Sequence, residues 1–205
     1  VNNWSIICVA DVRTRDSNKA YGSVILKIIQ ASLLLLELDD PCLLSILMVQ
    51  LAAAENYAYN ALHDLQGTKI PYYFGSGQFK LLMSSSEVTR VLILECFEGL
   101  SLRQWEDTFP EDVCDENPCE MSSPAGYQDL SNKTKPLIKV LPYGIIEVNK
   151  RGFIYHVCQE NILVMLSFED PEHIVFIDFP HCLVGVTEDQ IKEHGFNEVK
   201  AAISL

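Results

Sequence analysis

A long polar segment in the middle of the chain limits what this sequence can fold into. From Asp107 to about Lys135 the residues are mostly Pro, Asp, Glu, Ser, Asn and Cys, with few large apolar side chains. This composition does not supply the apolar surface needed for a core, so we expect an irregular insertion at about 107–135. Because 48% of all 205 residues are hydrophobic, the parts on either side of the insertion have enough apolar residues to pack.

The part before the insertion is expected to contain several strands and one helix. Ser5–Asp11 and Tyr21–Gln30 are rich in β-branched residues, and Val88–Cys96 is strongly apolar, which predicts three strands. The segment Ile70–Gly77 contains a proline and two glycines and is expected to be a turn that leads toward another strand. The helix is predicted over Leu51–Leu65, where apolar residues recur at spacings of three and four and a glycine follows. Its apolar face is expected to consist of Ala54, Tyr57, Ala58, Ala61, Leu62 and Leu65.

The part after the insertion is expected to be mixed. Short strands are predicted at Gly152–Tyr155, Asn161–Leu166 and His173–Phe179. Structure resumes at Pro136–Val148, although an internal proline and glycine weaken any helix there. Thr187–Ile203 has one helical pattern with a threonine as its N-cap.

The charge and hydropathy of the chain exclude two classes of partner. Acidic side chains outnumber basic ones by 28 to 15, and the formal net charge is −13, which repels the phosphate backbone of nucleic acids. The most apolar stretches, Ala31–Leu36 and Cys42–Ala54, are separated by acidic residues and a proline. Neither reaches the ~18 apolar residues that a membrane span needs, so we expect no membrane insertion.

The cysteines and the first residues indicate an intracellular, cytoplasmic location. Seven cysteines form no Cys-x-x-Cys pair, which argues against a disulfide framework or a zinc ribbon. A zinc site that uses Cys114 and Cys119 with a histidine is a weaker alternative, and nothing orients a cysteine toward a base for hydrolase chemistry. Val1–Trp4 lacks the basic segment of a signal peptide and an initiator Met, as expected for a piece of a longer product.

Four residues suggest phosphate and metal chemistry. Lys27 lies near the end of an apolar strand, and Glu55 lies on the expected helix. Asn161 opens one apolar strand and Asp178 closes the next, which would place two oxygen ligands for Mg²⁺ at one end of a hairpin. Each residue alone has a plainer interpretation: a surface lysine with a buried stem, a solvated helical charge, and two turn residues that cap a hairpin.

In this order the features resemble the protein-kinase-like superfamily. The order is a strand lysine, a helix glutamate, an apolar strand ending in Glu-x-x-x-Gly, then Asn-Ile-Leu-Val and Ile-Asp-Phe. The local sequence is most similar to kinase-like proteins of filamentous fungi, which are distantly similar to aminoglycoside and choline phosphotransferases. The resemblance covers roughly residues 5–185, without the insertion. It is carried by Glu55–Gly77, Leu92–Leu102, Tyr155–Val164 and Ile174–Phe179.

The resemblance implies an α+β, kinase-like fold of two lobes. The first lobe, residues 1–99, would be an antiparallel sheet with one helix, and residues 100–205 would form an abbreviated second lobe. Lys27 would hold the phosphates of ATP, and Glu55 would fix the direction of Lys27. Asn161 and Asp178 would hold Mg²⁺. The linker whose backbone would read the adenine edge consists of Glu95, Cys96 and Phe97.

The sequence departs from the family pattern where the catalytic acid belongs. The family carries an Asp five residues before the metal-binding Asn, and that position is His156 here. A neutral imidazole could take a proton near pH 7, and the alternative is a packed loop residue. No Gly-x-Gly-x-x-Gly precedes Lys27, Pro180 follows Phe179 where protein kinases have Gly, and no Ala-Pro-Glu follows. The shortened lobe would expose apolar surface, to be covered by a protein partner or by self-association.

Three functions are consistent with these residues. The first is a kinase-like protein that binds ATP and Mg²⁺ with impaired or absent phosphotransfer, as in a pseudokinase. The second is an active phosphotransferase on a protein or small-molecule hydroxyl, with His156 or a water in place of the acid. The third is a non-enzymatic interaction module in which Leu33–Leu47 and the acidic insertion bind another protein.

Overall fold

The chain has a mixed α+β fold with antiparallel sheets and few helices, as the sequence predicts at this level. The computed structural model describes residues 5–16, 19–30, 41–80, 88–107, 140–165 and 173–192, so most of the expected insertion at 107–135 lies outside the described residues. The chain divides into two compact units. The first comprises Val1–Phe97 and Asp178–Cys182, and the second comprises Glu98–Ile177 and Leu183–Leu205.

A four-stranded antiparallel sheet forms the body of the first unit. Its strands, in the order β1-β2-β4-β3, are β1 (Ser5–Arg13), β2 (Ala20–Ile29), β4 (Val88–Glu95) and β3 (Tyr73–Lys80). The strands predicted at Ser5–Asp11, Tyr21–Gln30 and Val88–Cys96 are confirmed as β1, β2 and β4. The expected turn over Ile70–Gly77 is wrong in part, because β3 already begins at Tyr73. The strand tolerates its glycines through a bulge between Tyr73 and Gly75, where Gly75 has a φ of 126°.

Helix α1 (Pro41–Ala61) is longer than predicted; Ala58, Leu62 and Leu65 are buried as expected, but the predicted face is wrong at Tyr57. It begins at a proline, which is favoured in the first turn, and a short 3₁₀ turn, η2 (His63–Leu65), follows it. Tyr57 was expected on the apolar face but is 55% exposed, whereas Tyr59 is fully buried. The prediction from apolar residues alone is wrong at this position because the inward face also carries a charged residue, Glu55. The buried stripe consists of Met48, Ala52, Glu55, Ala58, Tyr59 and Leu62.

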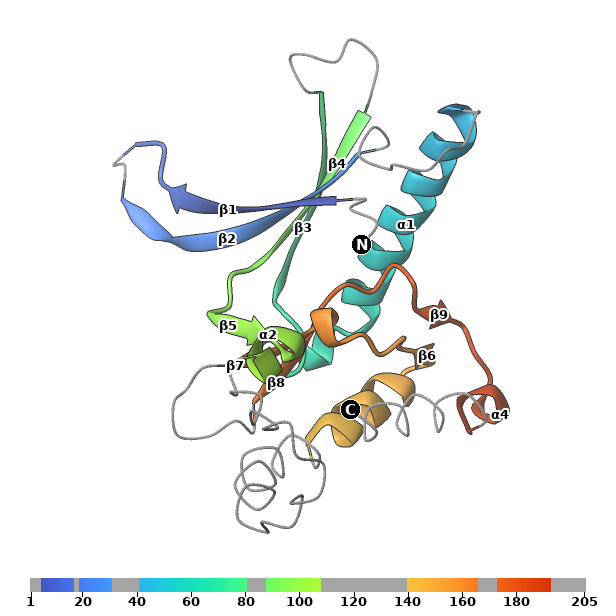
Figure 1. The fold of residues 1–205 in the computed structure, drawn as a ribbon. Coiled ribbons are helices and arrows are strands. Elements are labelled where there is room, and N and C mark those ends of the chain that lie inside the picture. Colours follow the sequence, from blue (N-terminus) through green and yellow to red (C-terminus); the bar gives the residue numbers. More distant parts are fainter. Residues whose placement is uncertain are drawn as a thin grey trace, which may run out of the picture. The chain divides into compact units, whose positions relative to one another are not determined.

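The strand register shows which side chains of the sheet face α1. Lys27 of β2 lies opposite Leu92 of β4, and Leu92 lies opposite Ser76 of β3. Residues that are directly opposite one another in a sheet point to the same face, so these three form one row across it. In Figure 1, α1 runs alongside this sheet, and Glu55 of α1 bonds to Lys27, which places the row on the side of the helix.

The second unit contains two small antiparallel sheets and short helices. The strands predicted after the insertion are confirmed, although each is shorter than expected. One sheet has the order β5-β7-β8, with β5 (Gly99–Ser101), β7 (Ile162–Met165) and β8 (Ile174–Phe176), and the other pairs β6 (Phe153–Ile154) with β9 (Leu183–Val184). The helical segments are α2 (Leu102–Asp107), residues 140–149, η3 (Gln159–Asn161) and α4 (Glu188–Gln190).

The N-cap predicted at Thr187 is confirmed. The Thr187 Oγ1 accepts a hydrogen bond from the Gln190 N–H at 3.3 Å, and the Gln190 side chain accepts one from the Thr187 N–H at 2.9 Å, which is a capping box. The expected continuation of this helix to Ile203 falls beyond the described residues. Within the described ranges, no helix combines the length and the apolar character needed to cross a membrane.

The helix at residues 140–149 forms despite Pro142 and Gly144, because the glycine allows close packing. A Cβ atom at Gly144 would lie 2.4 Å from Cε2 of Phe176, whose side chain is fully buried. No side chain larger than hydrogen fits this contact without moving the ring. The tertiary contact therefore outweighs the low helix propensity of glycine.

We expect Gly144→Ala to lower the free energy of unfolding by about 1–3 kcal/mol, because the added methyl group must displace the buried Phe176 ring. This loss would exceed the ~1 kcal/mol that alanine gains over glycine in helix propensity. Urea denaturation followed by circular dichroism measures the change.

The matched control is Tyr143→Ala on the same helix, where the side chain is 71% exposed. Its effect should stay within about 0.5 kcal/mol, as for most surface substitutions. A Gly144→Ala variant as stable as the wild type would contradict the close contact with Phe176.

Candidate functional site

A cluster of three charged side chains lies inside the first unit. The Lys27 Nζ donates a hydrogen bond to the Glu55 Oε1 at 2.7 Å and another to the Asp178 Oδ1. Lys27 comes from β2, Glu55 from α1, and Asp178 from the segment that follows β8. The structure therefore brings together three of the residues that the sequence singled out, although Asp178 is 151 positions from Lys27.

The cluster is largely withdrawn from water. Lys27 is 4% exposed and Glu55 is fully buried, whereas the Asp178 side chain keeps 23% of its exposure. Lysine and glutamate are almost never fully buried unless they are paired, because losing hydration costs several kcal/mol per ion. The plainer interpretations, a surface lysine and a solvated helical glutamate, are therefore wrong for Lys27 and Glu55.

The charged form of Glu55 is disfavoured by burial, although Lys27 contacts it. Burial raises the pKa of Glu55 above its usual 4.5, an effect that Lys27 opposes and the charge of Asp178 reinforces. The backbone N–H of Phe179 also lowers this pKa, yet no hydrogen bond of normal geometry reaches the Oε2 in the described part of the chain. A buried oxygen without a partner is a destabilising feature, and such features gather at functional sites.

Asp178 is held in an unusual backbone conformation. Its φ is 67°, in the left-handed region, and it is the only non-glycine residue with a positive φ in the described part of the chain. Asp enters this region more readily than most residues, but the conformation still requires support from its surroundings. It turns the carboxylate toward Lys27 while the next side chain, Phe179, is fully buried.

Three aromatic side chains that the sequence did not single out as functional support this conformation. The Phe179 ring packs edge-on against Tyr59, with ring centroids 5.2 Å apart, and Tyr59 stacks on Tyr73 at 5.4 Å. Burial raises the pKa of Tyr59 well above 10, and the charge of Glu55 adds to this rise. The only signal in the sequence is position, since Tyr59 lies four residues after Glu55 and therefore on the same helix face.

The predicted linker lies at the end of β4, and its first residue has a structural role. The Glu95 N–H donates to the Tyr72 carbonyl at 2.9 Å, and the Tyr72 N–H donates to the Glu95 Oε2 at 3.0 Å. Cys96 and Phe97 are half-buried. Within the described part of the chain, no backbone hydrogen bond uses the peptide groups of these two residues. The peptide groups of Cys96 and Phe97 are therefore better candidates than those of Glu95 for hydrogen bonds to a ligand.

The remaining predicted site residues, Asn161 and His156, belong to the second unit. The Asn161 carbonyl accepts a hydrogen bond from the Ile177 N–H at 2.9 Å, and the Tyr155 hydroxyl lies within bonding distance of the Asn161 and Ile177 carbonyls. These contacts hold the residue before Asp178 against the start of β7. His156 is exposed in the segment after β6.

The donor set fits a phosphate-bearing ligand better than a free metal ion. Among the described residues, no three His, Cys, Asp or Glu side chains gather into a metal site. Mg²⁺ that used the Asp178 carboxylate would therefore need further oxygen ligands from water or from the ligand itself, which is how Mg²⁺ accompanies nucleotides. Lys27 supplies a cation for phosphate oxygens beside that carboxylate.

Comparisons with known proteins do not assign the chain to a family, so its function is inferred from the residues described above. No protein-family model matches the chain, and a search of curated proteins finds no relative.

The raised pKa of Glu55 makes a prediction about pH. Because the folded protein binds this proton more tightly than the unfolded chain, stability due to Glu55 is lost as the pH rises from 4.5 through the raised pKa. We expect the free energy of unfolding of the wild type, minus that of Glu55→Gln, to fall over this range. The groups that face Glu55 are Lys27, Asp178 and Tyr59. Urea denaturation at a series of pH values measures the difference.

Glu147→Gln is the matched control, because its two ion pairs lower the pKa of this exposed carboxyl. Its contribution to stability is present above 4.5 and lost as the pH falls, so its difference from the wild type should be constant above 4.5. A constant or rising difference for Glu55→Gln in that range would show that Glu55 is not held at a raised pKa.

Proposed function

We propose that this chain is a kinase-like protein that binds ATP with Mg²⁺ and has impaired or absent phosphotransfer. The single observation that carries the proposal is the meeting of Lys27, Glu55 and Asp178 in one buried cluster. The first unit supports a kinase-like lobe, since it combines a four-stranded antiparallel sheet with one long helix that supplies the glutamate.

The cluster is hard to explain as a stabilising device. Replacing a buried ion pair by apolar residues of similar volume is often neutral or stabilising, because the lost hydration offsets the attraction between the charges. Here Lys27 faces two carboxylates, the Glu55 Oε2 lacks a hydrogen bond of normal geometry among the described residues, and Asp178 has a positive φ. Three unfavourable features at one place favour a role in ligand binding over a role in stability.

The chain's own residues would divide the binding work according to their burial. Glu55 is fully enclosed and would keep the ammonium group of Lys27 pointed at the ligand phosphates. Asp178 is partly exposed and would exchange its contact with Lys27 for one with the metal ion. Bound Mg²⁺ would supply neutralisation of phosphate charge, which is a large part of catalysis in phosphoryl transfer.

The segment before Asn161 explains why transfer would be impaired. The only acid in the segment Tyr155–Asn161 is Glu160, which accepts hydrogen bonds from the Cys158 thiol at 2.8 Å and from Arg103 at 3.1 Å. The Cys158 contact, with help from the backbone and Arg103, lowers the pKa of Glu160. A carboxylate with a lowered pKa is a weak general base.

Binding of Mg-ATP is the first test. At a concentration of about 100 times Kd, Mg-ATP should raise the free energy of unfolding by ~2.7 kcal/mol, which a thermal shift detects. Asp178→Asn should weaken Mg-ATP binding by about tenfold or more in calorimetric titration, because the amide is a poorer metal ligand.

Asp11→Asn is the matched control, because Asp11 is an exposed carboxylate on β1 of the same unit. It should bind Mg-ATP as the wild type does. A folded wild-type protein with no thermal shift in millimolar Mg-ATP would remove nucleotide binding from the proposal.

Turnover is the second test. We expect ATP hydrolysis by the wild type to be no faster than by Asp178→Ala, since the loop offers no free carboxylate to accept the proton of a hydroxyl. Radiolabelled ATP gives the rates, with a mock purification as the background. A rate that exceeds this background and disappears in Asp178→Ala would instead establish an active phosphotransferase.

A further inference from the structure

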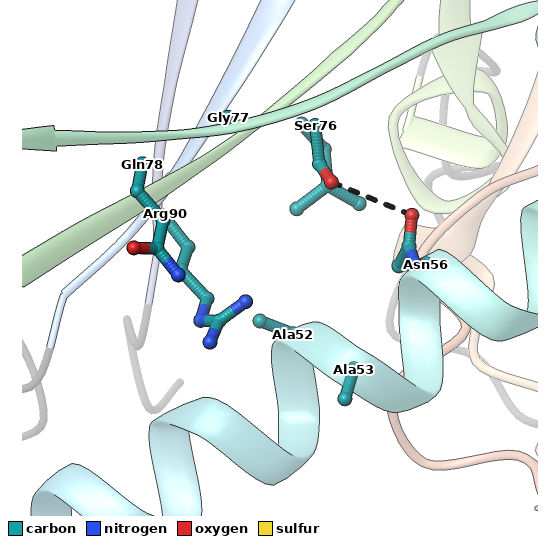
Figure 2. Close-up of a pocket in the computed structure, with 8 residues that line it drawn as sticks. Ala52, Ala53, Asn56, Ser76, Gly77, Gln78 and Arg90 are labelled. Carbon is teal, nitrogen blue, oxygen red and sulfur yellow. Dashed lines mark hydrogen bonds between the residues drawn. The ribbon is translucent and has the colours of Figure 1, made fainter.

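A second polar site lies in the first unit, between α1 and the strands β3 and β4. It is a pocket of about 260 Å³ whose polar lining residues are Asn56, Ser76, Gln78 and Arg90. Figure 2 shows Gln78 and Arg90 extending from the strands toward the helix, and Asn56 reaching from the helix toward Ser76. Lys27, Glu55 and Asp178 do not line this pocket, so it is distinct from the charge cluster.

Arg90 occupies a position where the sheet otherwise buries apolar side chains. It lies two residues before Leu92, which is 1% exposed, and opposite Ile29, which is 2% exposed. Residues two apart in a strand share a face, so Arg90 points to the side of α1. Its own side chain is half-buried.

Arg90 has no counter-charge in the described part of the chain. No salt bridge or hydrogen bond there involves its guanidinium group, and the lining of the pocket contains no acidic residue. This is unexpected in a chain with a net charge of −13, because acidic side chains are the more abundant ones. A half-buried cation without a counter-ion is unfavourable unless something else supplies the negative charge.

The other lining groups also suit an anion. Gln78 carries an amide with two N–H donors, and the Ser76 hydroxyl donates a long hydrogen bond of 3.5 Å to the Asn56 Oδ1. Ala52 and Gly77 are small and leave the space open. The guanidinium fork matches the oxygens of a carboxylate or a phosphate in a paired geometry.

We infer that this pocket binds a small oxyanion, a phosphate or carboxylate group, through Arg90 with Gln78 and Ser76 as additional donors. The volume is below the 300–1,000 Å³ of typical drug-sized sites, which suits a small anion or the charged end of a larger ligand. The site does not depend on nucleotide binding at Lys27.

The test is a titration with inorganic phosphate and, separately, with acetate, at constant ionic strength, followed by ¹H–¹⁵N NMR. The amide signals of Gly77 and Gln78 and the side-chain amide of Gln78 should shift in a saturable way. The stronger of the two responses identifies the oxyanion. Absence of a saturable shift at these signals with both anions would overturn the inference.

Variants separate a specific site from general salt effects. Arg90→Gln should weaken binding of the responding anion by about tenfold or more, and Arg90→Lys by less, since lysine keeps the charge but loses the fork. Arg13→Gln removes an exposed arginine of the same unit and should bind as the wild type does. An Arg90→Gln variant that titrates like the wild type would also overturn the inference.

Asp178→Asn distinguishes this site from the proposed nucleotide site. The shifts at Gly77 and Gln78 should persist in that variant, because Asp178 does not line the pocket. If the anion instead bound beside Lys27, the anion-induced shifts at Gly77 and Gln78 would differ between Asp178→Asn and the wild type. The pocket would then not be the binding site. Failure of Mg-ATP binding leaves the expected result unchanged.

Discussion

The buried ion pair between Lys27 and Glu55 sets the arrangement of the first unit. A lysine ammonium on a central strand cannot be enclosed without a partner, and the partner must come from the element that covers that face of the sheet. Glu55 therefore points inward from α1, and the rotation of the helix follows from it. Tyr59, four residues later, is carried into the core, while Tyr57 is turned out to solvent. The charged contact and the buried residues of α1 therefore lie on the same face of the helix.

The same contact explains how Asp178 is positioned. Because Tyr59 is buried on the face of α1 that carries Glu55, it offers an aromatic surface to Phe179. The burial of Phe179 fixes the residue before it, and Asp178 adopts a positive φ that directs its carboxylate to Lys27. The sheet, the helix and the late segment are therefore linked by one chain of contacts.

Much of this could be predicted from the sequence, and the exceptions have physical causes. Strand positions followed from β-branched residues, since β1, β2 and β4 are rich in them. The turn expected at Ile70–Gly77 was wrong in part because a bulge at Gly75 lets β3 keep its pairing. The expected face of α1 was wrong at Tyr57, because counting apolar residues leaves out a glutamate that pairs with a distant lysine.

Only those site residues could be predicted that residue type and order along the chain are enough to identify. Lys27, Glu55 and Asp178 could be chosen from their order along the chain, but not the aromatic support or the role of Glu95. Those depend on which face each side chain occupies, and a one-residue error in register moves a side chain to the other face. The role of Arg90 could not be predicted, because the sequence of an apolar strand does not show whether its arginine faces solvent or the helix.

The unequal burial of the two carboxylates determines which of them a ligand could displace. If Glu55 left Lys27, its charge would remain enclosed without a partner, and this costs several kcal/mol. Asp178 keeps contact with solvent, so water or a metal ion can replace the ammonium group at its oxygens. A polyanionic ligand would therefore compete with Asp178 and leave the Lys27–Glu55 pair intact. This asymmetry is what a site needs if one carboxylate orients the lysine and the other exchanges partners.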